Sequence, residues 1–295
     1  MGIATLSSRL LGMVREMCYS GFMGDGPVAA TFQLAFMIPN LFRRLLGEGA
    51  LTASFIPIFK QKEKNDGPTA MWHAANAVIS GLLVVSALIT VAVVLLISLV
   101  LALDSPDLIG PGIVKAMPEL AIKTAALLSP DTRLMLELSR IMFPYMIVIT
   151  LTAIFMGILN ARGHFFVPAM GATLLNLTLI GIVFFVAPHW GKTLDRQIFA
   201  LAFGVLVAGV IQAVYQLPTL YRDGFNFRWA TPWRDETVRQ VVRKMIPGMM
   251  GVAAFQLNML ITQGMAYSVD PDRHIVASFG YAVRLMELPQ GIFGL

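Results

Sequence analysis

Long apolar segments separated by short polar turns make up most of this sequence. The clearest runs from Gly67 to Leu103, contains no Asp, Glu, Lys or Arg, and exceeds the roughly 20 residues needed to cross about 30 Å of hydrocarbon. Because lipid offers no hydrogen-bond partner to an open strand edge, we expect every membrane segment to be helical. The eight predicted segments are 3–22, 27–59, 71–103, 134–160, 165–187, 197–221, 237–268 and 275–295.

Glycine, proline and aspartate mark the connections between these segments, since these residues favour turns. Clear examples are Gly24-Asp25-Gly26-Pro27 and Asn65-Asp66-Gly67-Pro68. Inside the long segment 27–59, Pro39 and the glycines on either side of Glu48 predict a kink or a break. Residues 113–128, in the largest predicted outer loop, could form a short amphipathic helix on the membrane surface.

Composition and charge support a membrane protein. Hydrophobic residues make up 57% of the chain, charged residues 13%, and the mean hydropathy is +0.72, whereas soluble domains average about 25% charged residues. Cys18 is the only cysteine, so the chain has neither an internal disulfide nor a cysteine-based metal site. We therefore predict an all-α polytopic membrane protein with about eight transmembrane helices.

The distribution of basic residues predicts the orientation. With a cytoplasmic N-terminus, the cytoplasmic connections hold ten Lys and Arg residues and the opposite connections hold six, which agrees with the positive-inside rule. The Arg-rich segment 222–244 carries Trp229 and Trp233, and next to a membrane segment it indicates an interfacial loop and not a nucleic-acid patch. We expect contacts with membrane lipids and none with nucleic acid.

Six arginines lie inside segments that are otherwise apolar enough to cross a membrane. A charge at the centre of a membrane helix costs roughly 2.5–3.5 kcal/mol, so we expect these arginines to face a shared wet cavity. A cationic cavity in a membrane indicates an anionic cargo. The six are Arg9, Arg15, Arg43, Arg44, Arg140 and Arg284.

The first segment places its charges in one stripe. Ser8 and Arg15 are seven residues apart, as are Arg9 and Glu16, so each pair nearly eclipses on a helix. An interfacial amphipathic helix with snorkelling arginines is the alternative interpretation of this stripe.

Arg43 and Arg44 stand near the middle of the second segment, about 24 Å of helix from either end, too far to snorkel. Arg44 and Glu48 can pair at i,i+4, which leaves Arg43 less compensated. Arg284 has Glu287 three residues on. Arg140 lies near the start of its segment, beside Glu137, where snorkelling or pairing accounts for it.

Several of these motifs together resemble the MurJ (MviN) family of lipid II flippases. They include Ser8-Arg9 with Arg15-Glu16, Pro39-Asn40 with Arg43-Arg44, Glu48-Gly49-Ala50, and Arg284 with Glu287 and Pro289. Phe143-Pro144-Tyr145, Leu174-Leu175-Asn176 and Tyr215-Gln216-Leu217-Pro218 also fit. The motifs extend over nearly the whole chain.

The resemblance implies a multi-pass protein of the bacterial inner membrane that flips undecaprenyl-pyrophosphate-linked peptidoglycan precursor by alternating access through a cationic cavity. It implies no enzyme activity, no cofactor and no metal, and it leaves cell-wall synthesis proteins open as partners. It also implies a six-helix lobe at 1–222, an interlobe linker at 223–236 and the first two helices of a second lobe at 237–295. The implied substrate-binding residues are Ser8, Arg9, Arg15, Arg43, Arg44, Glu48 and Arg284.

The sequence departs from the family pattern at three positions. Ala30 and Val283 stand where the family often has acidic residues, and Met37 stands where it often has a lysine. The chain also stops inside an apolar run, so we expect it to hold one lobe and part of a second, and not to alternate access alone.

Other functions stay open. A flippase for another polyprenyl-pyrophosphate-linked oligosaccharide, or a non-transporting scaffold that binds lipid-linked ligands, would keep the same cationic cavity. A membrane enzyme acting on polyprenyl phosphates would need an acidic metal cluster or a nucleophile with its base. The predicted segments contain few acids, at Glu16, Glu48, Glu137 and Glu287. A drug/cation antiporter would favour an acidic cavity.

Overall fold

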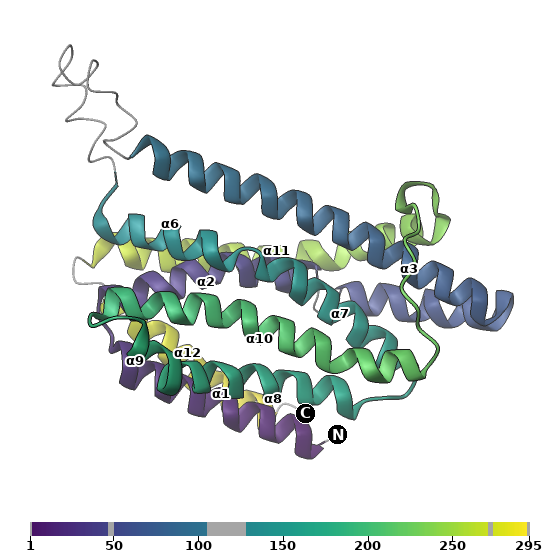
Figure 1. Cartoon of the computed structure of the whole chain (residues 1–295), viewed down its shortest axis with the longest axis horizontal. Helices are drawn as coiled ribbons and strands as arrows, with labels where there is room; N and C mark the ends of the chain where they lie inside the picture. Colours follow the sequence, from purple (N-terminus) through teal and green to yellow (C-terminus); the bar gives the residue numbers. More distant parts are fainter. Residues whose placement is uncertain (1, 47–49, 105–127, 271–273, 294–295) are drawn as a thin grey trace, which may run out of the picture.

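The computed structural model describes residues 2–46, 50–104, 128–270 and 274–293; within these ranges the side chains of residues 2–6, 42, 43, 46, 50, 52, 284 and 287–293 are not described. The described residues form helices and no strand, which confirms the predicted all-α class (Figure 1). In chain order the helices are α1 Gly2–Met23, α2 Pro27–Leu46, α3 Ala50–Leu103, α6 Pro130–Met142, α7 Tyr145–Ala161, α8 Phe166–Gly181, the π-helix η2 Ile182–Val186, α9 Ala187–Trp190, α10 Leu194–Arg222, the short η3 Pro232–Arg234, α11 Glu236–Val269 and α12 His274–Phe293.

Length and composition identify fewer membrane spans than the sequence pattern predicted. Within the described ranges, four helices are long and apolar enough to cross a membrane, namely 53–103, 166–190, 194–222 and 236–269. A fifth span results if α6 and α7, which meet at a 43° bend, are counted as one. The multi-pass architecture is therefore confirmed, whereas the prediction of about eight spans is not.

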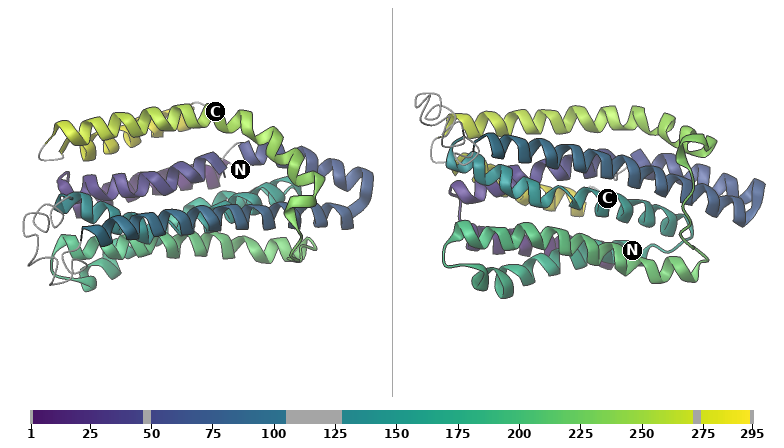
Figure 2. Two further views of the ribbon diagram at one scale, coloured as in Figure 1. Left: turned by 90° about the horizontal axis from the view of Figure 1, so that it is seen from above. Right: turned by 45° about the horizontal axis from the view of Figure 1, so that its top comes forward.

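In the predicted second segment, 27–59, the structure describes α2 up to Leu46 and α3 from Ala50. The expected break at the glycines that flank Glu48 lies outside the described residues. The predicted turn at 65–68 is confirmed, because α3 consists of two helices that meet at Gly67, whose φ of 82° lies outside helical geometry. Glycine tolerates this left-handed conformation, and Figures 1 and 2 show the chain reversing direction there. The expected surface helix at 113–128 lies almost wholly outside the described residues.

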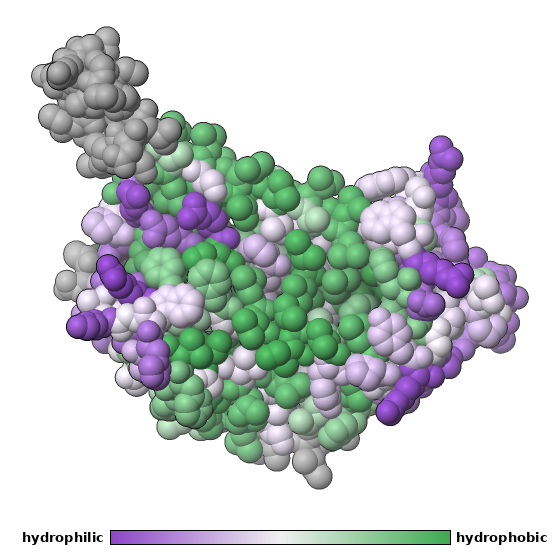
Figure 3. All heavy atoms as spheres, in the orientation of Figure 1, coloured by the Kyte–Doolittle hydropathy of each residue, from purple (hydrophilic) through white to green (hydrophobic). Residues whose placement is uncertain are grey.

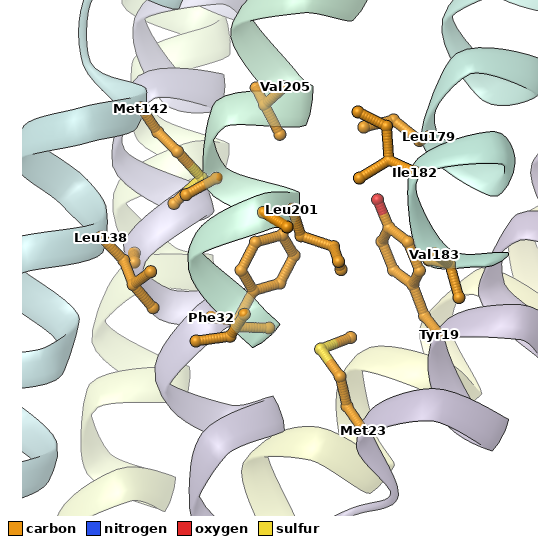
Figure 4. Close-up of a cluster of buried hydrophobic side chains, with 14 of the residues drawn as sticks. Tyr19, Met23, Phe32, Leu138, Met142, Leu179, Ile182, Val183, Leu201 and Val205 are labelled. Carbon is orange, nitrogen blue, oxygen red and sulfur yellow. The ribbon is translucent and has the colours of Figure 1, made fainter. Parts of the chain in front are cut away.

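Two apolar clusters hold the helices together. The first joins α1, α2, α6, α8 and α10, and Figure 4 shows Tyr19, Phe32 and Leu201 at its centre. The second joins α3, α7 and α11 around Phe55, Phe59 and other buried side chains. Membrane helices associate through close packing of this kind, because in lipid there is no hydrophobic driving force to bring them together.

The surface has an apolar middle and polar ends. Figure 3 shows a hydrophobic belt around the middle of the bundle and hydrophilic residues gathered toward both ends. Large side chains such as Leu95 and Phe185 are exposed within the apolar helices, at 63% and 77%. At one end, Arg162 pairs with Glu63 at 2.5 Å and His164 contacts Asp223 at 3.0 Å. This pattern is the one expected of a protein whose helices cross a bilayer.

The segment between α10 and α11 is fixed against α3. The backbone oxygen of Asn226 accepts a 3.0 Å hydrogen bond from the Asn76 side chain, and Ala230 N–H donates to Ser80 Oγ at 3.3 Å. Trp229 and Trp233 remain exposed. These two side chains fit the predicted interfacial loop, since tryptophan favours the membrane–water boundary.

α11 and α12 pack back onto the first helices. α11 lies along α3 and α2, while α12 lies along α1 and α2. The left view of Figure 2 shows α11 and α12 as a layer over α1 and α2. The division into a lobe at 1–222, a linker at 223–236 and a second part at 237–295 stays a prediction.

Candidate functional site

A cavity lined by both polar and apolar side chains lies between α1, α2, α11 and α12. Its volume is about 540 Å³. Leu179 of α8 and Val205 of α10 form part of its apolar wall. The polar wall residues are Arg15, Glu16, Gln33, Asn40, Arg44, Gln256 and Gln263, and the aromatic ones are Tyr19, Phe32, Phe36, Phe255 and Phe279. A cavity with two arginines, several amides and aromatic rings can bind an anionic group attached to a polar, uncharged body.

Arg15 is held on three sides at the wall of this cavity. Its Nη1 donates to Asn176 Oδ1 at 3.0 Å, and its Nη2 pairs with the carboxylate of Glu16. Its guanidinium carbon lies 5.5 Å from the centre of the Tyr19 ring, a cation–π distance. The side chain is only 14% exposed, so Arg15 faces the interior of the bundle and does not reach toward a membrane surface.

The predicted polar stripe of α1 faces α8. The backbone oxygen of Ser8 accepts a 3.1 Å hydrogen bond from Asn176 Nδ2. Gly12 lies between Ser8 and Arg15 on the same face, and a Cβ there would be in ordinary contact, 3.6 Å from Asn176 Nδ2. Because α1 packs along α8 and α12 inside the bundle, the alternative of an interfacial surface helix is not supported.

Arg9 is not part of the wall of this cavity. It is half-buried, and its Nη1 is buried with no hydrogen-bond partner in the described part of the chain. Neither Arg9 nor Ser8 belongs to the described cavity wall. The structure therefore brings Ser8 and Arg15 together through Asn176, and leaves Arg9 beside that arrangement.

Arg44 is the second arginine at the cavity wall, one turn after Asn40 on α2. The side chains of Arg43 and Arg284 and all of Glu48 lie outside the described residues, so the predicted pairing of Arg44 with Glu48 lies outside them as well. The backbone of Arg284 follows Val283, which lines the cavity. Arg140 is exposed, and Glu137 pairs with Arg133 at 3.3 Å.

The positions that depart from the family pattern lie at or near the cavity. Met37 and Val283 belong to its wall. Ala30 is fully buried and packs with Val276 at the contact between α2 and α12. The cavity wall therefore has apolar side chains at two places where a charge is common in the family.

Sequence reasoning assigned no role to the amide side chains of the site, although Asn40 and Asn176 stand in the motifs that resemble the family. Gln33, Gln256 and Gln263 line the cavity, and Asn176 contacts Arg15. These residues carry no charge, so a search for intramembrane charges passes over them. The available signal was an asparagine in the middle of the apolar segment 165–187.

The fold matches solved transporters. The inward-facing conformation of a multidrug resistance MATE family transporter of the MOP superfamily aligns with TM-score 0.64 and 16% identity, over 97% of this chain and 60% of that one. A MOP superfamily transporter from Pyrococcus furiosus aligns with TM-score 0.63 and 18% identity, over 98% of this chain and 59% of that one. The chain therefore shares the fold of these transporters over nearly its whole length.

The family follows from the sequence. The family model described as "Lipid II flippase MurJ" matches residues 19–295, and the chain belongs to this family, as the motifs indicated. A probable lipid II flippase MurJ of Treponema pallidum is 32% identical over 99% of this chain and 52% of that protein. The lipid II flippase MurJ of Burkholderia cenocepacia is 33% identical over 99% of this chain and 53% of that protein. The chain thus spans about half the length of these curated relatives.

Proposed function

We propose that this chain forms the N-terminal portion of a lipid II flippase, in the bacterial inner membrane with its N-terminus in the cytoplasm. The cargo is the undecaprenyl-pyrophosphate-linked peptidoglycan precursor. The observation that carries the proposal is Arg15, held inside the bundle at the wall of a cavity of about 540 Å³. Family membership supports the choice of cargo.

Pyrophosphate has several acceptor oxygens that guanidinium groups can bind bidentately, and such bonds are strong where water is excluded. Arg15 and Arg44 supply this chemistry at the described wall, and Arg9, Arg43 and Arg284 extend it. The amides of Gln33, Gln256 and Gln263 provide neutral donors and acceptors for the sugar and peptide part. The lipid tail stays in the bilayer, so only the head group enters the cavity. No covalent bond is made or broken.

Alternating access requires contacts that close one end of the cavity and can be broken. The polar contacts between α12 and the α1–α2 region include three in the described residues: Tyr281 Oη donates to Gly24 O at 3.0 Å, Gln33 Nε2 donates to Ala277 O at 3.4 Å, and His274 lies 3.3 Å from Asp25. Individually weak contacts suit a gate, because each contributes little to the stability of one state. Rocking of 237–295 against 1–222 would break them and expose the cavity on the other side.

A second cargo is favoured by one observation. Met37 and Val283 give the cavity wall apolar side chains at positions where the family resemblance implies a charge. A flippase with fewer wall charges could accept a different polyprenyl-pyrophosphate-linked oligosaccharide, because the pyrophosphate and not the sugar contacts the arginines.

The proposal is tested by reconstitution in liposomes. Because the chain spans about half of its relatives, it is assayed alone and joined to the C-terminal half of the Burkholderia cenocepacia relative. We expect the joined protein to flip lipid II faster than a lipid-linked O-antigen unit, Arg15→Ala to abolish flipping, and Arg140→Ala, which alters an exposed arginine, to leave it unchanged. Equal rates for Arg15→Ala and the unmodified protein would contradict the proposal.

A further inference from the structure

The neutral side chain of Asn176 on α8 bonds both to the side chain of Arg15 and to the backbone of α1, the helix that carries Arg15. Asn176 of α8 accepts a 3.0 Å hydrogen bond from Arg15 Nη1 through Oδ1, and donates a 3.1 Å hydrogen bond to the backbone oxygen of Ser8 through Nδ2. Each end of the amide therefore has the partner that its chemistry requires. This double use sets the orientation of the amide and places its oxygen at Arg15.

Asn176 is buried, so its side-chain amide needs hydrogen-bond partners inside the protein. The side chain is 7% exposed in a helix that is otherwise mostly apolar. A buried amide without hydrogen-bond partners destabilises the folded state, so an asparagine here is unfavourable unless its hydrogen bonds are made. Both bonds go to the polar stripe of α1, which shows where the side chain acts.

The charge of the acceptor also matters. Glu16 already pairs with Arg15 Nη2, so the two side chains together are formally neutral. A second carboxylate at the Nη1 side would make this group net negative, and it would repel an anion. An amide oxygen orients the guanidinium plane without adding negative charge.

We infer that Asn176 is a positioning residue for Arg15, holding the guanidinium plane at the cavity wall without adding negative charge where a lipid-linked pyrophosphate would bind. This inference rests on the proposed function. Asn176 need not touch the cargo, since it acts through Arg15. Its bond to Ser8 also fixes the distance between α8 and the first turns of α1.

Three variants separate positioning from a purely structural contact. Asn176→Leu removes both hydrogen bonds at similar volume. Asn176→Asp keeps an acceptor for Arg15 but adds the charge that the inference says must be absent. Thr173→Val is the matched control, because Thr173 lies one turn away on α8, is also 7% exposed, and has an Oγ1 without a hydrogen-bond partner in the described part of the chain.

The experiment measures binding of undecaprenyl pyrophosphate to the protein in lipid nanodiscs, with thermal unfolding recorded for each variant. We expect Asn176→Leu and Asn176→Asp each to weaken binding roughly tenfold or more, the scale of one hydrogen bond to a charged group. Thr173→Val stays within about twofold on the same scale. The double variant Arg15→Ala with Asn176→Leu binds no worse than Arg15→Ala alone, because both changes remove the same interaction.

Two results would overturn the inference: full binding by Asn176→Leu, or additive losses in the double variant. A loss in Asn176→Leu that Asn176→Asp restores would assign Asn176 a structural role only. If Arg15→Ala binds as well as the unmodified protein, the proposed function fails instead. The positioning is then decided without a ligand, by nitrogen NMR of labelled arginine side chains. Slow, separately resolved Nη signals of Arg15 that survive in Asn176→Leu would contradict it.

Discussion

Gly280 of α12 lies directly against the side-chain amide of Gln33 on α2, so close that a Cβ at position 280 would overlap the Gln33 oxygen. The same amide donates to Ala277 O, one turn earlier on α12. The absence of a side chain at 280 therefore permits the contact that brings α12 onto α2. Since both helices line the cavity, this contact sets how far one side of the cavity is closed.

Gly280→Leu should push α12 away from α2 and widen the cavity, because Gln33 can yield only by leaving its hydrogen bond with Ala277. We expect a longer distance between spin labels on α2 and α12 in double electron–electron resonance. Gly251→Leu on α11 is the control, since a Cβ there meets no atom within 4 Å. An unchanged distance in Gly280→Leu would show that this contact does not control the position of α12.

Gly209→Ala should destabilise the bundle. A Cβ at 209 would lie 2.7 Å from the ring of Tyr145, which is 2% exposed and has no room to move. Overpacking of this kind costs typically about 1–3 kcal/mol. Thermal unfolding in detergent should show a lower midpoint for Gly209→Ala. Gly264→Ala, in open space on α11, should be neutral or slightly stabilising, and equal midpoints for the two variants would refute the packing argument.

Arg15→Lys should bind cargo poorly although it keeps the positive charge. A lysine ammonium cannot reproduce the planar fork that contacts Asn176 and Glu16 from adjacent nitrogens. Losing one hydrogen bond to a charged group removes about 1.5–3 kcal/mol, so we expect roughly a tenfold to hundredfold weaker affinity for undecaprenyl pyrophosphate. Affinity equal to that of the unmodified protein would favour a general positive field over bidentate binding.

Cavity positions should be open to water from one side. In a background with Cys18→Ser, Gln263→Cys should react with a membrane-impermeant thiol reagent from one side only, because Gln263 lines the cavity. Ala208→Cys should not react, since Ala208 is fully buried within α10. Mass spectrometry of the labelled protein measures both. Failure of Gln263→Cys to react from either side would mean that the cavity holds no accessible water in the membrane.

Features that depend on neighbours along the chain were predictable. Apolar length marked α10 and α11 closely, because the need to satisfy backbone groups in lipid leaves only helices for such segments. The stripe of Ser8 and Arg15 followed from helical periodicity, and the reversal at Gly67 from the turn residues around it. The family motifs were also readable without coordinates.

Features that depend on packing between distant segments were not predictable from the sequence. Arg15 and Asn176 are 161 residues apart, and no periodicity within α1 or α8 places one beside the other. The sequence identified the arginines as unusual, because charged residues are rare in lipid-crossing segments. It did not identify Asn176 as the neutral partner of Arg15. That contact depends on the packing of α1 against α8, which brings the donor and the acceptor within hydrogen-bonding distance.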